Sequence, residues 1–173
     1  MRKTKLKKLT FLAIVTAVSL VMFLIEALIP SPVPLPGVKL GLSNIVTTCI
    51  LFLLGWREAL AVLLLRVFLG SLLTGQLGAL VYSLSGGLLS LFCLILLRRA
   101  LMPHSLWIAG VIGGAMHNVG QILAAILLTQ TPSVIVYLPL LLCCGMLAGL
   151  FTGLCAQFLL QRLKKIKFSE DIL

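Results

Sequence analysis

Acidic residues are scarce in this chain of 173 residues, and their scarcity excludes several classes of enzyme. Only Glu26, Glu58, Glu170 and Asp171 carry carboxylates, and the one adjacent pair lies close to the C-terminal end. Enzymes that bind diphosphates through aspartate-rich metal motifs need several carboxylates close together. Walker A, HExxH and GxSxG motifs are also missing, which argues against ATPase, metalloprotease and serine hydrolase sites. We therefore expect no catalytic residues, no metal site and no cofactor.

Charged residues of either sign make up only 10% of the chain, whereas 61% of the residues are hydrophobic. An ordinary soluble domain does not have this composition. The net charge of +10 comes from short basic blocks between apolar runs, without interleaved aromatic residues. Nucleic-acid binding is therefore not expected, and the basic flanks are suited to contact anionic lipid headgroups. The composition predicts an integral membrane protein.

The apolar runs are long enough for about six helices that cross the membrane, since each needs about 20 residues. The first two runs are separated by PSPVPLPG, whose four prolines do not fit inside a helix. We expect an all-α protein, a compact bundle of six transmembrane helices that forms a single membrane domain over residues 1–173. The predicted spans cover residues 9–29, 39–54, 58–74, 78–97, 105–128 and 134–161.

The distribution of lysine and arginine favours one orientation of these spans, because cytoplasmic flanks of membrane helices are enriched in both. If the N-terminus is inside, every basic residue except Lys39 and Arg66 falls on the inner side. Both termini are therefore expected on the cytoplasmic side of the membrane.

Arg66 lies near the middle of the third predicted span, where a charged side chain is costly unless it has partners. Glu26 is the one acidic residue at comparable or outer depth, so a structural ion pair from Glu26 to Arg66 or to Lys39 is one interpretation. The other is that Arg66, or Lys39 at the outer mouth of the second span, contacts an anionic group of a ligand. Both interpretations remain open on the sequence alone.

Two polar motifs offer further ligand contacts. In GGAMHNVGQ, residues 113–121, His117 and Gln121 share a helix face, whereas Asn118 points about 100° away and is placed to bond a neighbouring helix. A lone buried histidine is most often a hydrogen-bonding core residue, but the two nearby amides favour a ligand site. PGVKLGLSNI, residues 36–45, brings Lys39, Ser43 and Asn44 to the outer start of the second span. These groups are expected to converge on one outward-facing pocket.

Small residues recur at four-residue spacing, which lets helix backbones approach closely in lipid. The glycines with this spacing are Gly110 and Gly114 in the fifth span and Gly145, Gly149 and Gly153 in the sixth. We expect them to pack these two spans against each other. Ala13 and Ala17 form the same pattern in the first span, where docking of a partner protein is an alternative to internal packing.

The six-span layout, PGVKLGLSNI, Arg66 and GGAMHNVGQ together resemble the Gx transporter family, also named heptaprenyl diphosphate synthase component I. That family is similar to the substrate-binding S components of energy-coupling factor (ECF) vitamin transporters. The resemblance implies a bundle in a bacterial cytoplasmic membrane that captures a small molecule from outside, with a coupling transmembrane subunit and two ATPases as partners. An AxxxA face docks S components onto the coupling subunit, and the matching residues here are Ala13 and Ala17. The substrate-binding residues implied are Lys39, Asn44, Arg66, His117, Asn118 and Gln121.

The leading hypothesis is therefore the substrate-binding subunit of an ECF-type uptake transporter. Its ligand would be a small anionic metabolite, and Arg66, Lys39 and the family name together point to isoprenoid or quinone metabolism. The alternative is a non-catalytic membrane subunit that anchors a heptaprenyl diphosphate synthase. A carrier that uses His117 and Glu26 as proton-binding groups is disfavoured, because many secondary carriers are built from internal repeats and none is obvious here.

Overall fold

The computed structural model describes residues 2–29, 41–100 and 105–165, and within these ranges the chain is helical without a strand. The helices are α1 (Arg2–Leu28), α2 (Asn44–Leu53), α3 (Trp56–Thr74), α4 (Leu77–Leu97), α5 (Leu106–Thr129), the 3-10 helix η1 (Pro132–Tyr137) and α6 (Leu138–Lys165). The prediction of an all-α protein is confirmed. Four segments are long and apolar enough to cross a membrane, as expected of a membrane protein. They are Leu6–Leu28, Gly78–Leu97, Leu106–Thr129 and Pro132–Leu163.

The bounds of α3, α4 and α5 differ from the predicted spans by at most two residues. Their ends are set by local backbone chemistry: Gly75 closes α3 with a φ of 65°, and Gln130 closes α5 with a φ of 52°. The sixth helix starts later than expected, because Pro132 opens a 3-10 turn before α6 begins at Leu138.

The second helix is shorter than the sequence predicts. We expected a span from residue 39 to 54, but α2 begins only at Asn44, after a turn in which the Asn44 N–H donates to the Gly41 carbonyl at 2.9 Å. Gly41 has a φ of +82°, a conformation that glycine adopts without strain. Ten residues rise about 15 Å, half the thickness of the hydrocarbon core. The start of α2 therefore lies inside the fold.

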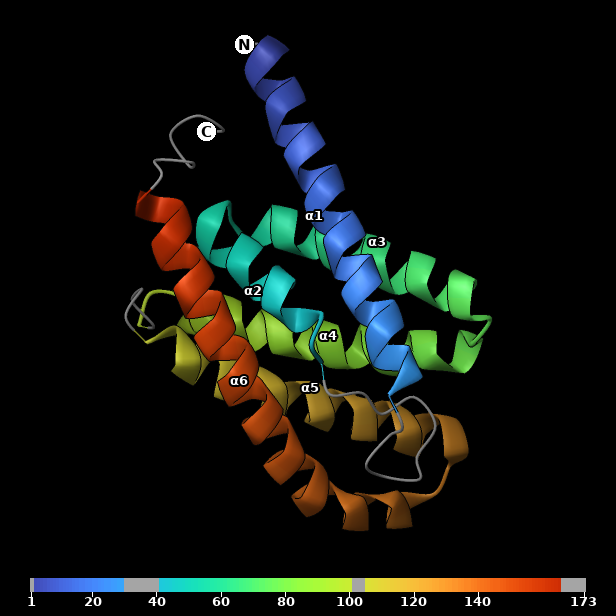
Figure 1. The fold of residues 1–173 in the computed structure, drawn as a ribbon. Coiled ribbons are helices and arrows are strands. Elements are labelled where there is room, and N and C mark those ends of the chain that lie inside the picture. Colours follow the sequence, from blue (N-terminus) through green and yellow to red (C-terminus); the bar gives the residue numbers. More distant parts are fainter. Residues whose placement is uncertain (1, 30–40, 101–104, 166–173) are drawn as a thin grey trace.

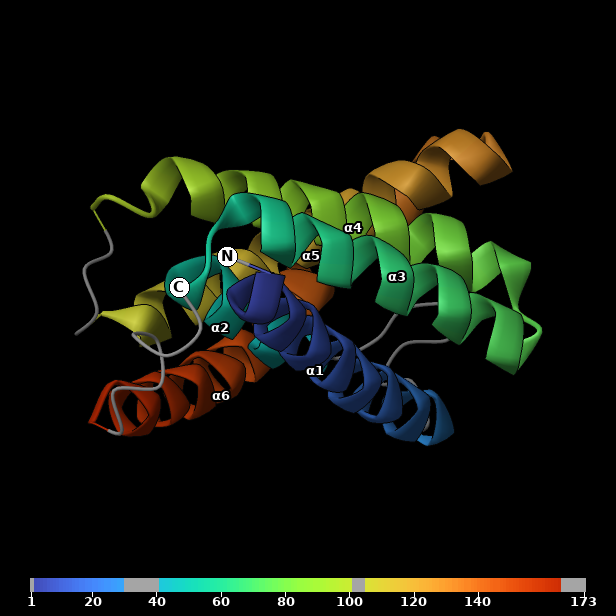
Figure 2. The same cartoon turned by 90° about the horizontal axis from the view of Figure 1, so that it is seen from above.

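The helices form two layers. Figure 1 shows α3, α4 and α5 side by side with alternating directions, and α1 and α6 crossing in front of them. In the view from above, α1 and α6 diverge and α2 lies between them (Figure 2). α1 packs on α3 and α6 on α5, while α2 contacts α1, α3, α4 and α6. The short helix α2 is therefore the central element, and seven of its ten residues are buried.

The glycines of α5 and α6 face each other. A Cβ atom at Gly153 would lie 2.8 Å from the Leu106 carbonyl oxygen, and one at Gly145 would lie 2.8 Å from that of Gly114. Real Cβ atoms do not approach other atoms this closely, so the two helices touch backbone to backbone. The expected packing role of these glycines is confirmed.

An ion pair joins the N-terminal part of α1 to the start of α3. The Lys8 Nζ atom lies 2.6 Å from the Glu58 Oε1 atom, and both side chains are partly exposed. A pair of this kind adds little stability. It does show that α1 and α3 are neighbours at this end of the bundle.

Candidate functional site

Arg66 lies in the middle of α3 and is 2% exposed. Its Nη1 atom donates to the Ser43 hydroxyl, and its Nη2 atom donates to the Asn44 Oδ1 atom at 3.3 Å. Both acceptors lie at the start of α2, where Ser43 is the N-cap and Asn44 the first helical residue. The third nitrogen, Nε, is buried without an acceptor. The guanidinium group is therefore only partly satisfied by the protein.

Glu26 of α1 lies on the other side of the turn that precedes α2. Its carboxylate is 3% exposed and accepts a hydrogen bond from the Gly41 N–H. It also interacts electrostatically with Arg66. The two opposite charges therefore attract each other across α1 and α3.

These groups line a small cavity, which we call the charged cavity. Its volume is about 10 Å³, which is the space that one water molecule occupies. Its wall is formed by α1, the turn before α2, α3, α4 and α5. The lining residues are Phe23, Glu26, Gly41, Ser43, Arg66, Ser83 and His117.

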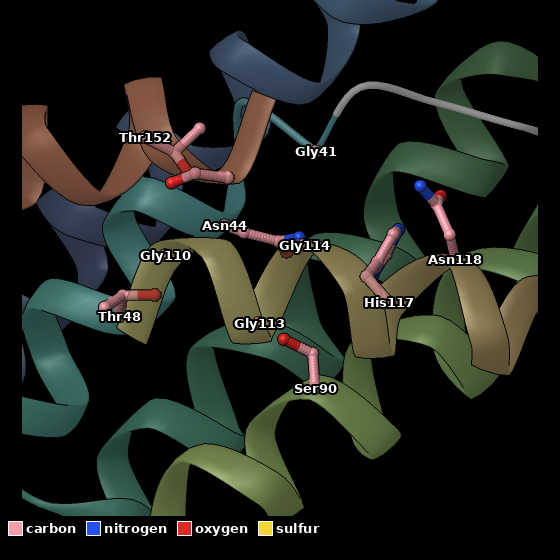
Figure 3. Close-up of a pocket in the computed structure, with 11 residues that line it drawn as sticks. Gly41, Asn44, Thr48, Ser90, Gly110, Gly113, Gly114, His117, Asn118 and Thr152 are labelled. Carbon is pink, nitrogen blue, oxygen red and sulfur yellow. The ribbon is translucent and has the colours of Figure 1, made fainter. Parts of the chain in front are cut away.

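A second cavity of about 10 Å³ shares Gly41 and His117 with the first and has no formally charged residue among those described in its lining; we call it the neutral cavity. Figure 3 shows its residues on α2, α4, α5 and α6, around the glycines of α5. The lining residues are Gly41, Asn44, Thr48, Ser90, Gly110, Gly113, Gly114, His117, Asn118, Gly149 and Thr152.

The polar residues of α5 face the cavities and the two neighbouring helices, α4 and α6. His117 lies at the junction of the two cavities and is 5% exposed, beside Gly86 of α4. The Asn118 Nδ2 atom donates to the Leu141 carbonyl of α6 at 2.5 Å, which confirms that it bonds a neighbouring helix. Gln121 is buried against Gly86. The glycine at position 86 makes room for both, since a Cβ there would lie 2.9 Å from His117 Nδ1.

The structure brings together four of the six predicted substrate-binding residues. Asn44, Arg66, His117 and Asn118 line the two cavities, whereas Gln121 faces α4 instead. Lys39 lies outside the described residues. The predicted docking residues Ala13 and Ala17 are both exposed on α1.

Sequence reasoning missed several hydroxyl groups that line the cavities. Thr48 follows Asn44 by four residues, and Ser90 follows Ser83 by seven, so each pair shares a helix face. That spacing is a usable signal, although hydroxyls in apolar helices commonly bond the preceding turn of their own helix. Thr152 does so here, donating to the Gly149 carbonyl at 3.0 Å.

The arrangement is suited to binding. Among the described residues, no three histidine, cysteine, aspartate or glutamate side chains are grouped so that they could hold a metal ion. The charged cavity instead offers one guanidinium, one carboxylate, an imidazole and two hydroxyls in surroundings with little water. Electrostatic contacts made there are stronger than in solvent.

Comparison with known proteins gives one family. Residues 15–159 match the family model described as heptaprenyl diphosphate synthase component I, in agreement with the resemblance seen in the motifs. No curated protein and no solved structure matches the chain. The matched range contains both cavities and all six helices in whole or in part.

Proposed function

Because the chain belongs to the heptaprenyl diphosphate synthase component I family, we propose a function that suits a membrane component without catalytic groups of its own. The protein is the membrane-embedded substrate-binding subunit of an ECF-type uptake transporter. It captures a small metabolite with an anionic carboxylate or phosphate group from outside, and an isoprenoid- or quinone-related compound fits the family name. A coupling transmembrane subunit and two ATPase subunits supply the energy.

One observation carries this proposal: the buried Nε atom of Arg66 has no acceptor, and Arg66 lines a cavity. Leaving a charged donor unsatisfied in the interior of a membrane protein is costly and marks functional positions. An anionic ligand group beside Nε would complete the hydrogen bonding of the guanidinium. The substrate-binding residues of the proposal are Lys39, Asn44, Arg66, His117, Asn118 and Gln121, with Ser43 added from the contacts of Arg66.

The structure corresponds to a closed site in this proposal, because each cavity holds no more than about one water molecule. Entry of a metabolite requires the cavities to widen. The contacts that must give way are the hydrogen bonds from Arg66 to Ser43 and Asn44. Residues 41–43 precede the first turn of α2 and are not helical. They can therefore move with a smaller loss of helical hydrogen bonds than the rest of this wall.

We also propose six spans with both termini on the cytoplasmic side of the bacterial cell membrane, as a single membrane domain. Arg57, Arg98 and Arg99 lie at the start of α3 and the end of α4, which adjoin one another at one end of the bundle in Figure 1. The C-terminal end of α6 lies at the same end. This clustering suits a cytoplasmic face.

Ala13 and Ala17 are the proposed docking residues for the coupling subunit. Both are exposed on α1, and α1 covers the bundle on one side only, against α3 and α2. Two small residues four positions apart allow a partner helix to approach closely in the membrane.

The test is affinity purification of the detergent-solubilised protein from its native membrane, with mass spectrometry of the proteins and small molecules that accompany it. We expect a coupling subunit, ATPases and a bound metabolite. Ala13→Trp should remove the partner proteins but not the metabolite. Val18→Trp is the matched control, because Val18 is also exposed on α1 but points about 140° away from Ala13.

The alternative function is a non-catalytic membrane subunit that holds a heptaprenyl diphosphate synthase at the membrane. The family description favours it, since it names a component of that enzyme. Recovery of a prenyl synthase without ATPases in the same purification would support this alternative and reject the transporter subunit.

A further inference from the structure

The formal charges of the described residues that line the charged cavity cancel. Among its described lining residues, α1 contributes the negative Glu26 and α3 the positive Arg66, while α4 contributes the uncharged Ser83. The turn before α2 adds Gly41 and Ser43, which are also uncharged. His117 of α5 contributes an imidazole, which counts as neutral at pH 7. The described wall therefore has no net charge.

This balance restricts the ligands that the cavity can hold. An unpaired charge in a low-dielectric interior is strongly unfavourable, and next to the described wall a lone anion would leave one negative charge in excess. A molecule that carries one negative and one positive group leaves the balance unchanged. It also offers each of the two protein charges a partner of opposite sign.

We propose, on the basis of the binding function above, that the ligand is a small zwitterion. Its anionic group contacts the Arg66 Nε atom, and its cationic group lies beside the Glu26 carboxylate. The mutual attraction of Glu26 and Arg66 is then replaced by two ion pairs with the ligand. Glu26 thus selects for the positive group and is a specificity-determining residue as well as a structural partner of Arg66.

The neutral cavity extends this assignment. It adjoins the charged cavity at Gly41 and His117, and its polar lining consists of hydroxyl, amide and imidazole groups. The buried Oδ1 atom of Asn118 has no hydrogen-bond donor there. Once the cavities have widened, this side suits an uncharged polar part of the ligand that carries at least one donor.

The experiment is equilibrium dialysis of the purified protein in lipid nanodiscs against an extract of small metabolites from its native cells. Mass spectrometry then identifies the compounds that the protein enriches over empty nanodiscs. We expect zwitterions, enriched by about tenfold or more, and loss of that enrichment in Arg66→Gln. Enrichment of compounds with a net negative charge would reject the zwitterion proposal but agree with the proposed binding function. If no compound is enriched, both proposals are rejected.

Glu26→Gln gives a second, independent readout. Removing the carboxylate should weaken enrichment of the zwitterion by about tenfold or more and favour analogues that keep the anionic group but lack the cationic one. Glu58→Gln is the matched control, because Glu58 pairs with Lys8 and lines neither cavity. Unchanged zwitterion enrichment in folded Glu26→Gln protein overturns the proposal, and the wild-type result decides it if this variant does not fold.

Discussion

At the scale of single residues, Arg66 joins three helices. It belongs to α3, donates to Ser43 and Asn44 at the start of α2, and interacts with Glu26 of α1. Removing the side chain of such a buried charge destabilises the protein, because each of its former partners is then buried without a hydrogen bond or counter-charge.

Replacing Arg66 by Gln should therefore lower the free energy of unfolding by about 3 kcal/mol, the usual result of breaking a buried charge pair. Glu26→Gln should also destabilise the protein, because the Gly41 N–H then donates to a neutral amide and Arg66 loses its counter-charge. The double variant should lose less than the sum of the two, with a coupling of about 1–2 kcal/mol.

Equilibrium unfolding of the detergent-solubilised proteins measures all three values. Strictly additive losses would show that the two side chains do not interact in the membrane-protein interior, contrary to the structure.

At the scale of elements, the crossing of α5 and α6 depends on glycine rather than on interlocking large side chains. Gly110 and Gly114 face Gly145, Gly149 and Gly153. The same crossing forms part of the neutral cavity, because Gly110, Gly114 and Gly149 also line it. The close approach of these two helices therefore places Asn118 and Thr152 in the lining of the neutral cavity, which α2 also lines.

Gly149→Ala should destabilise the protein by about 2 kcal/mol or more, since the new methyl group would meet the backbone of Gly110 and Val111. Gly78→Ala in the first turn of α4 is the matched control. A Cβ there has no atom within 4 Å, so the helix propensity of alanine should leave stability unchanged or raise it by up to about 1 kcal/mol.

Thermal unfolding monitored by the elution of monodisperse protein compares the two variants. Equal midpoints for Gly149→Ala and Gly78→Ala would mean that α5 and α6 are not in backbone contact.

At the scale of the whole molecule, the two layers leave most of the outward-facing surface apolar. Large hydrophobic side chains such as Phe68 and Leu72 of α3, Phe92 of α4 and Leu147 of α6 are more than half exposed. In lipid this surface is solvated by acyl chains and needs no protein partner. Polar groups instead gather around the start of α2, in the interior.

The proposed topology predicts opposite accessibility for the two ends of α4. In a variant without the five native cysteines, Gln76→Cys should react with a membrane-impermeant maleimide on intact cells, because Gln76 is exposed in the turn before α4. Arg99→Cys, exposed beyond the other end of α4, should react only after the cells are lysed. The reverse pattern, or reaction of both on intact cells, would contradict cytoplasmic termini.

The sequence by itself determined which parts of this chain are helical and that they belong in a membrane. Long apolar runs bounded by prolines, glycines and basic residues are a local signal, so the ends of α3, α4 and α5 were predicted within two residues. The motifs also identified the family, and helical spacing correctly predicted that Asn118 bonds a neighbouring helix.

Only the tertiary structure decided where α2 begins and which groups surround Arg66. Leu40, Leu42 and Ile45 continue an apolar run in the sequence, so hydropathy cannot show that the chain turns at Gly41 before the helix starts at Asn44. That late start places Ser43 and Asn44 beside Arg66, more than 20 positions away in the chain. Contacts between distant residues depend on how whole helices pack, and the hydrophobic periodicity of a single helix does not predict which helices will be its neighbours.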